Sequence, residues 1–211
     1  EETGLILPIG DFVIHQACRA TKFWQDRFLA PPPISVFINI SGKQFLQHDF
    51  IETLRKVIET SGIPAECLHL ELTESILIEN TEIMARTLQD IKKLNIKLVI
   101  DDFGTGYSSL SYLHNFPIDS LKIDRSFISA MDNYSDSMEI VRTILLMGHN
   151  LGLEVIAEGV ETASQLEKLR KLKCDYVQGY LISRPMEKSK IENFLLSKQR
   201  LPDFITQTTT V

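Results

Sequence analysis

The 211-residue sequence has few cysteines, a single tryptophan and no long apolar run. Its three cysteines, Cys18, Cys67 and Cys174, lie far apart and form no CxxC pair, which excludes a disulfide framework and a zinc ribbon. This cysteine usage favours a reducing, cytoplasmic location. No apolar segment has the length that a bilayer crossing needs, and no signal-peptide pattern is recognised. The sequence starts at Glu1 without an initiator methionine, so we expect it to be cut from a longer protein.

Positive charge is in deficit, because 22 lysines and arginines face 28 aspartates and glutamates, for a formal charge of −6. This balance argues against DNA or RNA duplexes as partners, since a surface that binds nucleic acid is basic. An anionic ligand would have to be held by local cations or metal ions. The length and the apolar content of 44% predict one packed domain over residues 1–211, with a C-terminal tail from about residue 200.

Predicted helices and strands alternate along the chain. Strands are expected over about residues 35–40, 67–72, 97–100, 120–124, 153–159 and 175–180. Helices are expected over about residues 10–29, 44–60, 81–94, 136–151, 162–172 and 188–197. Gly62 is expected to end the helix over 44–60. One face of the helix over 136–151 is expected to consist of Ile140, Val141, Ile144, Leu145 and Gly148. Strand-then-helix units in series predict a parallel sheet, either doubly wound or closed into a barrel.

Each predicted strand carries a polar residue at or near its C-terminal end. These residues are Asn39, Glu71, Asp101 with Asp102, Lys122, Glu158 and Gln178. In an open sheet only the strands beside the switch point meet at one ligand, whereas in a barrel every strand end faces the same mouth. The pattern therefore predicts an α/β fold with a TIM-like (β/α)8 barrel. Such a barrel has about 250 residues, so one or two units are expected to be missing at the N-terminus.

Two adjacent carboxylates, Asp101 and Asp102, end an apolar strand and precede a loop that contains Gly104 and Gly106. Half-buried acids side by side repel each other, and a divalent cation would compensate their charge. The alternative is a solvated turn in which Asp102 caps the next helix. Hard oxygen donors without a cluster of soft ligands favour Mg²⁺ or Mn²⁺ over zinc or copper.

The strand-end residues suit metal-assisted phosphoryl chemistry. Two metal ions about 4 Å apart would activate a water and stabilise both oxygens of an in-line displacement. Lys122 would offset phosphate or hydroxide charge, Glu158 is a candidate metal ligand or general base, and Gln178 would orient a water. Each residue also has a purely structural interpretation on its own. Glu74 is expected to anchor the loop after Asp102, and the absence of a Gly-x-Ser-x-Gly motif disfavours a serine nucleophile.

Taken together, the motifs resemble those of the EAL domain family, the metal-dependent phosphodiesterases of bacterial cyclic di-GMP signalling. The strings that carry the resemblance are Asn39-Ile40-Ser41, Glu71-Leu72-Thr73-Glu74, Asp101-Asp102-Phe103-Gly104-Thr105-Gly106-Tyr107-Ser108-Ser109, Leu121-Lys122-Ile123-Asp124, Ala157-Glu158-Gly159-Val160-Glu161 and Gln178-Gly179-Tyr180. The resemblance implies a TIM-like barrel and hydrolysis of cyclic di-GMP to linear pGpG with Mg²⁺ or Mn²⁺, with Ca²⁺ inhibitory.

The resemblance also implies roles for individual residues. The implied metal ligands are Asn39, Glu71, Asp101, Asp102 and Glu158. The implied catalytic residues are Lys122 and Glu158, which would activate water, and Asp102; the implied substrate contacts are Gln178, Glu161 and Asp124. The loop implied to couple metal binding to dimerisation consists of Gly104, Thr105, Gly106, Tyr107, Ser108 and Ser109, with Glu74 as its partner. A homodimer and fusion to GGDEF or sensory domains are implied as well.

The Glu-Ala-Leu motif that names the family lies upstream of the residues present here. In the family, the glutamate of this motif is a metal ligand, so weakened hydrolysis is expected if the 211 residues are the whole molecule. If the parent protein supplies the motif, a competent enzyme is expected. A cyclic di-GMP receptor without hydrolysis is the second hypothesis, and a protein-interaction module without a nucleotide ligand is the third.

Overall fold

The computed structural model describes residues 4–28, 32–78, 81–106, 113, 115–132 and 135–198. The chain forms two compact units, one of Glu1–Lys122 with Asn150–Leu153 and one of Ile123–His149 with Glu154–Val211. The predicted tail at about 200–211, and Tyr107, Ser108 and Ser109 of the predicted loop, lie outside the described residues. Within the described ranges, none of the helices has the length and apolar character that crossing a membrane requires.

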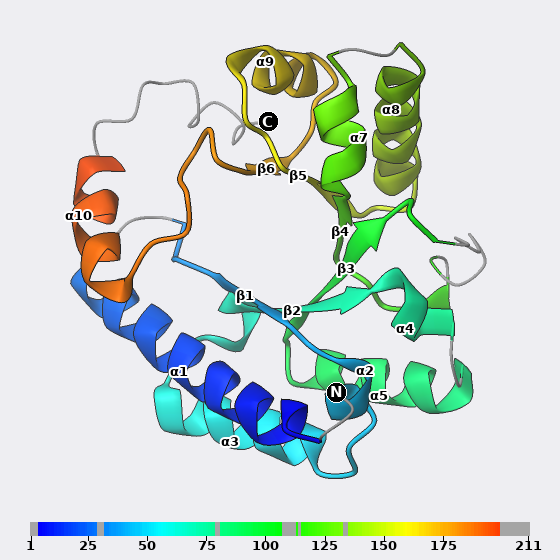
Figure 1. Cartoon of the computed structure of the whole chain (residues 1–211). Coiled ribbons are helices and arrows are strands. Elements are labelled where there is room, and N and C mark those ends of the chain that lie inside the picture. The colour runs from blue at the N-terminus through cyan, green and yellow to red at the C-terminus, as the bar shows by residue number, and fades with distance from the viewer. Residues whose placement is uncertain are drawn as a thin grey trace. The chain divides into compact units, whose positions relative to one another are not determined.

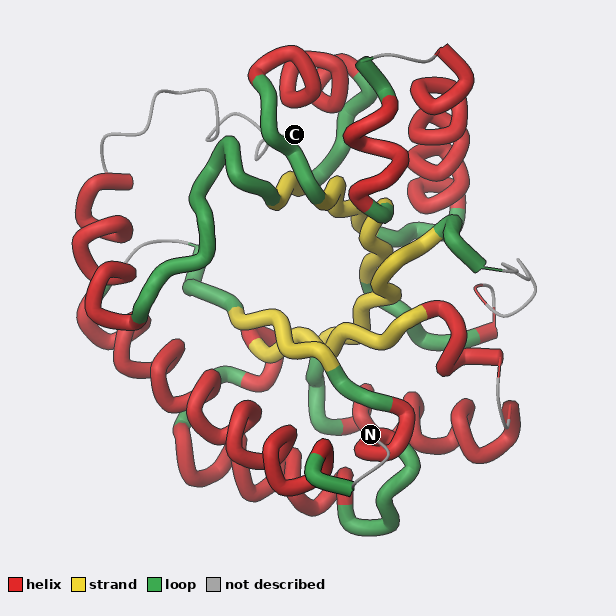
Figure 2. The backbone as a smooth tube through the Cα atoms, viewed as in Figure 1, coloured by secondary structure: helices red, strands yellow, loops and turns green. Residues whose placement is uncertain are grey.

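The first unit is organised around parallel strands (Figures 1 and 2). These are β1 (Val36–Asn39), β2 (Leu68–Thr73), β3 (Lys97–Phe103) and β4 (Ser120–Ile123), which neighbour one another in that order. In the register, Asn39 pairs with Glu71, and Thr73 pairs with Asp101. The strand interiors are apolar, and Leu70, Leu98 and Ile100 are at most 1% exposed. Because neighbouring strands run in the same direction, their C-terminal residues lie at one edge of the sheet.

The helices of the first unit are α1 (Ile6–Arg27), α2 (Gly42–Phe45), α3 (Phe50–Ser61), α4 (Glu74–Ile78) and α5 (Thr81–Lys93), with a short 3₁₀ turn, η1 (Ala65–Cys67). Helices α1 and α3 lie side by side (Figure 1). Helix α1 begins four residues earlier than predicted, because Pro8 sits in the first turn, where its missing N–H needs no partner.

The predicted helix over 44–60 is wrong as a single element. It forms α2 and α3 with a break between them, because Ser41 and Gln44 make a reciprocal capping box that starts α2 early. The Ser41 hydroxyl accepts the N–H of Gln44 at 3.3 Å, and Gln44 Oε1 accepts the N–H of Ser41 at 3.3 Å. The end of α3 is as predicted, since Gly62 has a left-handed φ of 70° and donates its N–H to Ile58 at 2.9 Å.

The second unit contains β5 (Glu154–Glu158) and β6 (Tyr176–Gln178), which pair in parallel, with Glu158 opposite Gln178. Its helices are α7 (Arg125–Ala130), α8 (Ser135–Asn150), α9 (Ala163–Lys171) and α10 (Lys188–Lys198). Helix α7 was not predicted, because six residues are too few to show a helical period. The predicted apolar face of α8 is corrected at Ile140, which is 41% exposed and lies at the edge of the stripe.

Candidate metal centre

Two buried carboxylates and one buried ammonium meet in the first unit. Glu71, Asp101 and Lys122 are 4%, 7% and 2% exposed. Lys122 Nζ lies 3.0 Å from Glu71 Oε1 and 3.0 Å from Asp101 Oδ1. Because two carboxylates share one ammonium, the cluster carries a formal charge of −1 in a place where water cannot screen it. Such a cluster favours a further cation.

The three residues come from three strands. Glu71 is two residues before the end of β2, Asp101 is two residues before the end of β3, and Lys122 is next to last in β4. On β1, the exposed Asn39 is the register partner of Glu71. The structure therefore brings together Glu71, Asp101 and Lys122 by direct contact, and places Asn39 on the strand beside them.

Asp102 follows directly and has an exposed side chain. Its φ of 54° is left-handed, a conformation that costs energy for a residue with a Cβ but that aspartate tolerates better than most. Its N–H donates to Asp101 Oδ1 at 3.0 Å. Asp101 is buried and Asp102 is exposed, but a carboxylate oxygen of each lies within 4.8 Å of the other, so the turn leaves both oxygens within reach of one cation.

The loop after β3 contacts Glu74, the buried first residue of α4. The N–H of Gly104 donates to Glu74 Oε2 at 3.3 Å. A Cβ added at Gly106 would lie 3.0 Å from Glu74 Oε1, which is closer than side chains normally approach. These are the contacts that a loop anchor requires, and Thr105 continues the turn by donating its hydroxyl to the carbonyl of Asp102 at 2.9 Å.

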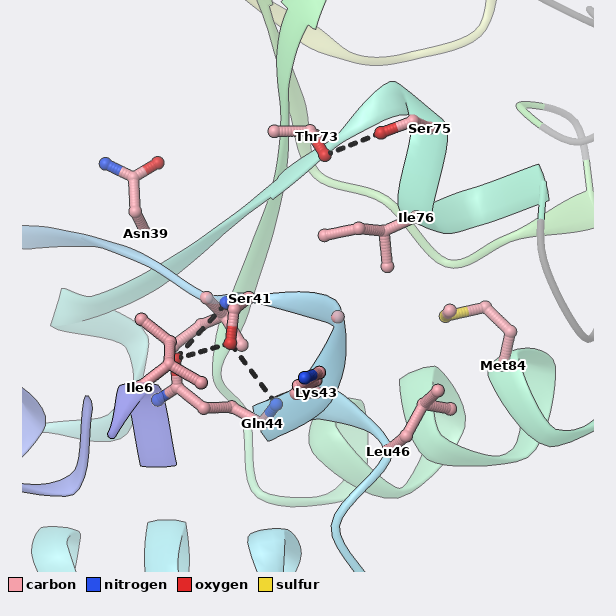
Figure 3. A pocket seen from close by; sticks show the side chains of 12 residues that line it. Ile6, Asn39, Ser41, Lys43, Gln44, Leu46, Thr73, Ser75, Ile76 and Met84 are labelled. Atoms are coloured by element: carbon pink, nitrogen blue, oxygen red, sulfur yellow. Dashed lines mark hydrogen bonds between the residues drawn. The ribbon is translucent and has the colours of Figure 1, made fainter. Parts of the chain in front are cut away.

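A cavity of about 590 Å³ opens beside Asn39 (Figure 3). Its polar lining includes Ser41, Gln44, Thr73 and Ser75, with Ile76 and Met84 among the apolar residues. The hydroxyls of Thr73 and Ser75 form a hydrogen bond with each other at 3.1 Å. Sequence reasoning missed this cavity. The Ser-x-x-Gln pattern marks the start of α2, but the space itself depends on how helices of the first unit pack around it.

The remaining predicted site residues belong to the second unit. Glu158 is half-buried at the end of β5, and its register partner Gln178 is exposed at the end of β6. Glu161 is exposed. Asp124 caps α7, because its Oδ1 accepts the Ser126 N–H at 2.9 Å and also the Ser126 hydroxyl.

The protonation of Asp124 agrees with this capping role. Partial burial raises its pKa, but the hydrogen bonds from Ser126 outweigh burial and hold the pKa below its ordinary value. The carboxylate is therefore engaged in stabilising a helix start, a role that the sequence interpretation as a substrate contact did not include.

The donor set of the first unit fits a hard divalent ion. Carboxylate oxygens of Glu71, Asp101 and Asp102 and the amide oxygen of Asn39 are the ligand types that Mg²⁺ and Mn²⁺ prefer. The cysteines in the same unit, Cys18 and Cys67, are buried. The net negative charge of the buried cluster adds an electrostatic reason for a cation to bind there.

Comparison with known proteins gives consistent matches. YkoW, a signaling protein of Bacillus subtilis, is 42% identical over 198 residues, which cover 94% of this chain and 24% of that protein. The cyclic di-GMP phosphodiesterase NbdA of Pseudomonas aeruginosa is 39% identical over 195 residues, which cover 92% of this chain and 25% of that protein. The chain thus spans about a quarter of the length of these relatives.

A solved structure of the PaMucR phosphodiesterase in complex with c-di-GMP is 37% identical and superimposes with a TM-score of 0.86 over 90% of this chain and 76% of that chain. This match confirms the predicted TIM-like α/β fold. The family model described as the EAL domain matches residues 1–185. The matched residues include the strand-end acids and the loop after Asp101-Asp102. The chain therefore belongs to the EAL domain family.

Proposed function

We propose that this chain is the hydrolytic domain of a bacterial cyclic di-GMP phosphodiesterase, which converts cyclic di-GMP to linear pGpG with Mg²⁺ or Mn²⁺. The observation that carries the proposal is the buried Glu71–Lys122–Asp101 cluster at the ends of parallel strands. The names of similar proteins support the choice of substrate, since NbdA is a cyclic di-GMP phosphodiesterase and PaMucR was solved with c-di-GMP.

In the proposed mechanism, Asn39, Glu71, Asp101 and Asp102 would hold the metal. A divalent ion bound there would supply Lewis-acid polarisation of the phosphodiester and a lowered pKa for a water. Lys122 holds the carboxylates of Glu71 and Asp101 in place and balances part of their charge.

Glu158 is proposed as the group that accepts the proton of the attacking water, with Gln178 and Glu161 as substrate contacts. The water oxygen forms a new bond to phosphorus, and the bond from phosphorus to the 3′ oxygen breaks. The leaving 3′ oxygen takes up a proton, so that the product is linear and carries a 5′ phosphate.

Release of pGpG in the presence of Mn²⁺ tests the proposal. The variant Asp101→Asn keeps the shape of the side chain but removes one buried charge, so we expect its rate to fall by more than the roughly 10–100-fold that outer-shell changes cause. Asp90→Asn is the matched control, because Asp90 is exposed and pairs only locally with Lys93 at 2.7 Å. Equal rates for the two variants would refute the metal-ligand role of Asp101. Ca²⁺ in place of Mn²⁺ is expected to inhibit.

The other hypotheses give different results in the same experiments. Binding of c-di-GMP without pGpG release would identify a receptor, and calorimetry without any nucleotide binding would indicate a protein-interaction module. Unchanged hydrolysis by Glu158→Ala would remove Glu158 from the mechanism.

The predicted homodimer, the fusion to GGDEF or sensory domains and the cytoplasmic location stay predictions. One relative, MucR of Pseudomonas aeruginosa, is named a bifunctional diguanylate cyclase and cyclic di-GMP phosphodiesterase, and the matching residues cover 27% of it. Size determination of the longer protein and of this chain, with and without Mn²⁺, would test the dimer and its coupling to the metal.

A further inference from the structure

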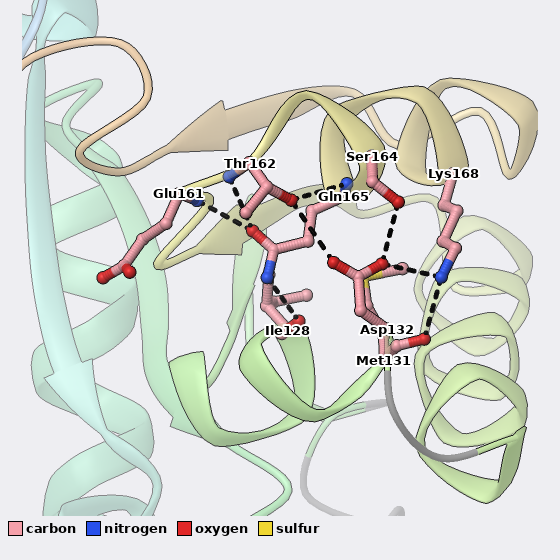
Figure 4. A network of polar contacts seen from close by, with 8 residues as sticks. All are labelled: Ile128, Met131, Asp132, Glu161, Thr162, Ser164, Gln165 and Lys168. Atoms are coloured by element: carbon pink, nitrogen blue, oxygen red, sulfur yellow. Dashed lines mark hydrogen bonds and ion pairs between the residues drawn. The ribbon is translucent and has the colours of Figure 1, made fainter.

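A buried glutamine amide holds the segment that follows Glu158. Gln165 is 5% exposed although it lies in the first turn of α9. Its Oε1 accepts the N–H of Glu161 at 2.8 Å and the N–H of Thr162 at 3.0 Å. Its Nε2 donates to the carbonyl of Ile128 in α7 at 3.3 Å. Figure 4 shows this amide between the two backbone segments.

We propose that Gln165 is a positioning residue for the proposed hydrolysis, because its amide ties the chain after β5 to α7 and so holds the strand end that carries Glu158. The inference rests on the proposed function. It goes beyond that function because Gln165 belongs to no predicted metal or substrate set and acts through the backbone.

The chain between Glu158 and Gln165 is packed closely on other sides as well. Gly159 has a φ of 81°, and a Cβ there would lie 2.6 Å from Cβ of Arg125 in α7. The N–H of Val160 donates to the carbonyl of Gln178 at 3.0 Å. Only Gly159 and Val160 separate Glu158 from Glu161, so we expect release of Glu161 from the Gln165 amide to shift Glu158 through this short segment.

An amide is the side chain that can do this at neutral pH. The site needs an acceptor for two N–H groups and a donor for one carbonyl, and a glutamine amide supplies both. A glutamate of the same shape keeps the acceptor but loses the donor when it is ionised. When it is protonated, the glutamate regains a donor, so the same position can be tested in both states within one variant.

A second set of contacts, centred on Asp132, lies beside the amide on one side (Figure 4). Asp132 accepts hydrogen bonds from Thr162 Oγ1 at 3.3 Å, Ser164 Oγ at 3.0 Å and Lys168 Nζ at 2.7 Å. These hydrogen bonds, with the one from Lys168 the largest contribution, hold the pKa of Asp132 below its ordinary value. The Asp132 side chain is 26% exposed, so water can reach its contacts, whereas Gln165 is 5% exposed. We therefore assign the positioning role to the buried amide and not to the Asp132 carboxylate.

The test compares Gln165→Glu and Gln165→Met with a matched control, Gln25→Glu. The control also removes an amide donor to a backbone carbonyl, because Gln25 Nε2 donates to Ile34 at 2.6 Å, but it lies in α1 of the first unit. Hydrolysis of c-di-GMP with Mn²⁺ gives kcat and KM across pH. Amide hydrogen exchange at Glu161 and Thr162 reports the geometry independently of activity.

We expect Gln165→Glu to lower kcat by about tenfold to a hundredfold at neutral pH, since displacement of a catalytic group by about 1 Å has effects of this size. KM should rise as well, because the amide also holds Glu161, a proposed substrate contact, and the ratio of the kcat of Gln165→Glu to that of the unchanged chain should rise as the pH falls. Gln165→Met should also accelerate exchange at Glu161 and Thr162. The Gln25→Glu control should keep the unchanged kcat.

Faster exchange at Glu161 and Thr162 with an unchanged kcat would overturn the positioning role, because these amides would then be released without consequence for the reaction. A loss of kcat no larger than that of Gln25→Glu would overturn it too. Absence of pGpG release from the unsubstituted protein with the Glu-Ala-Leu segment in place would instead refute the proposed function, and this inference with it, so the two failures are distinguished by that unsubstituted protein.

Discussion

Replacing Lys122 with methionine is expected to destabilise the metal-free protein much more than the loss of a surface charge does. The lysine side chain is 3% exposed, and its ammonium is 3.0 Å from carboxylate oxygens of both Glu71 and Asp101. Methionine retains much of the apolar volume but removes the charge. The two buried carboxylates would then lose the ammonium that they share, and the formal charge of the three residues would change from −1 to −2.

The expected magnitude follows from burial. Removing one partner of a buried ion pair costs about 3–5 kcal/mol, because the remaining charge stays desolvated. The control Lys93→Met breaks a pair with Asp90 in which the side chains are 75% and 46% exposed. An exposed pair of this kind contributes about 1 kcal/mol or less. The free energy of unfolding should therefore fall several times more in Lys122→Met than in Lys93→Met.

Urea unfolding in EDTA and in Mn²⁺ measures this difference. If Glu71 and Asp101 bind the metal, Mn²⁺ replaces the missing positive charge, so the loss in Lys122→Met should shrink when Mn²⁺ is added. The Lys93→Met variant should respond to Mn²⁺ as the unchanged protein does. An equal loss of stability for both variants in EDTA would refute the electrostatic reasoning, and a loss in Lys122→Met that Mn²⁺ leaves unchanged would refute the link to the metal.

Two further predictions concern the loop and the pH dependence. Gly106→Ala should displace the Glu74 carboxylate, accelerate hydrogen exchange at Gly104 and reduce hydrolysis, with little change in unfolding free energy. Gly62→Ala, where φ is 70°, should instead cost about 1 kcal/mol of stability and leave hydrolysis intact. Burial lowers the pKa of His69 from 6.5 to about 4, so the neutral ring is favoured in the folded state. The neutral His69 ring therefore makes its whole contribution to the free energy of unfolding above pH 6.5, and this contribution is lost as the pH falls toward 4. In urea unfolding, the free energy of unfolding of His69→Gln should fall less over that pH range than that of the unchanged protein.

Most of the helices and strands that were predicted correctly are marked by the spacing of apolar residues in the sequence. Strand β2 and helix α5 each lie within one residue of their predicted bounds, because alternating or helical apolar spacing continues through them. The break between α2 and α3 was missed since no proline or glycine marks it. The Asp49 N-cap of α3 makes no side-chain capping hydrogen bond, so the sequence there carries little signal.

The motifs predicted polar side chains at the strand ends, and Glu71, Asp101 and Lys122 lie there in contact with one another, while the functional roles of the predicted site residues stay predictions. The contacts of these side chains were not predicted. Lys122 was predicted to face phosphate or hydroxide, and the structure shows its ammonium between two carboxylates. Asp124 was predicted to contact substrate, and its carboxylate caps α7. In both cases the partner depends on which side chains packing brings within 3 Å, a distance that spacing along the chain does not encode.

By itself, the sequence determined the family, the alternation of strands and helices and the residues at the strand ends, since these depend on residue identity and local order. Only the tertiary structure decided that Glu71, Asp101 and Lys122 share one buried cluster and that the amide of Gln165 joins two segments of the second unit. The physical reason is that burial and hydrogen bonding between distant residues arise from packing of whole elements, and the energies that matter for the site come from that packing.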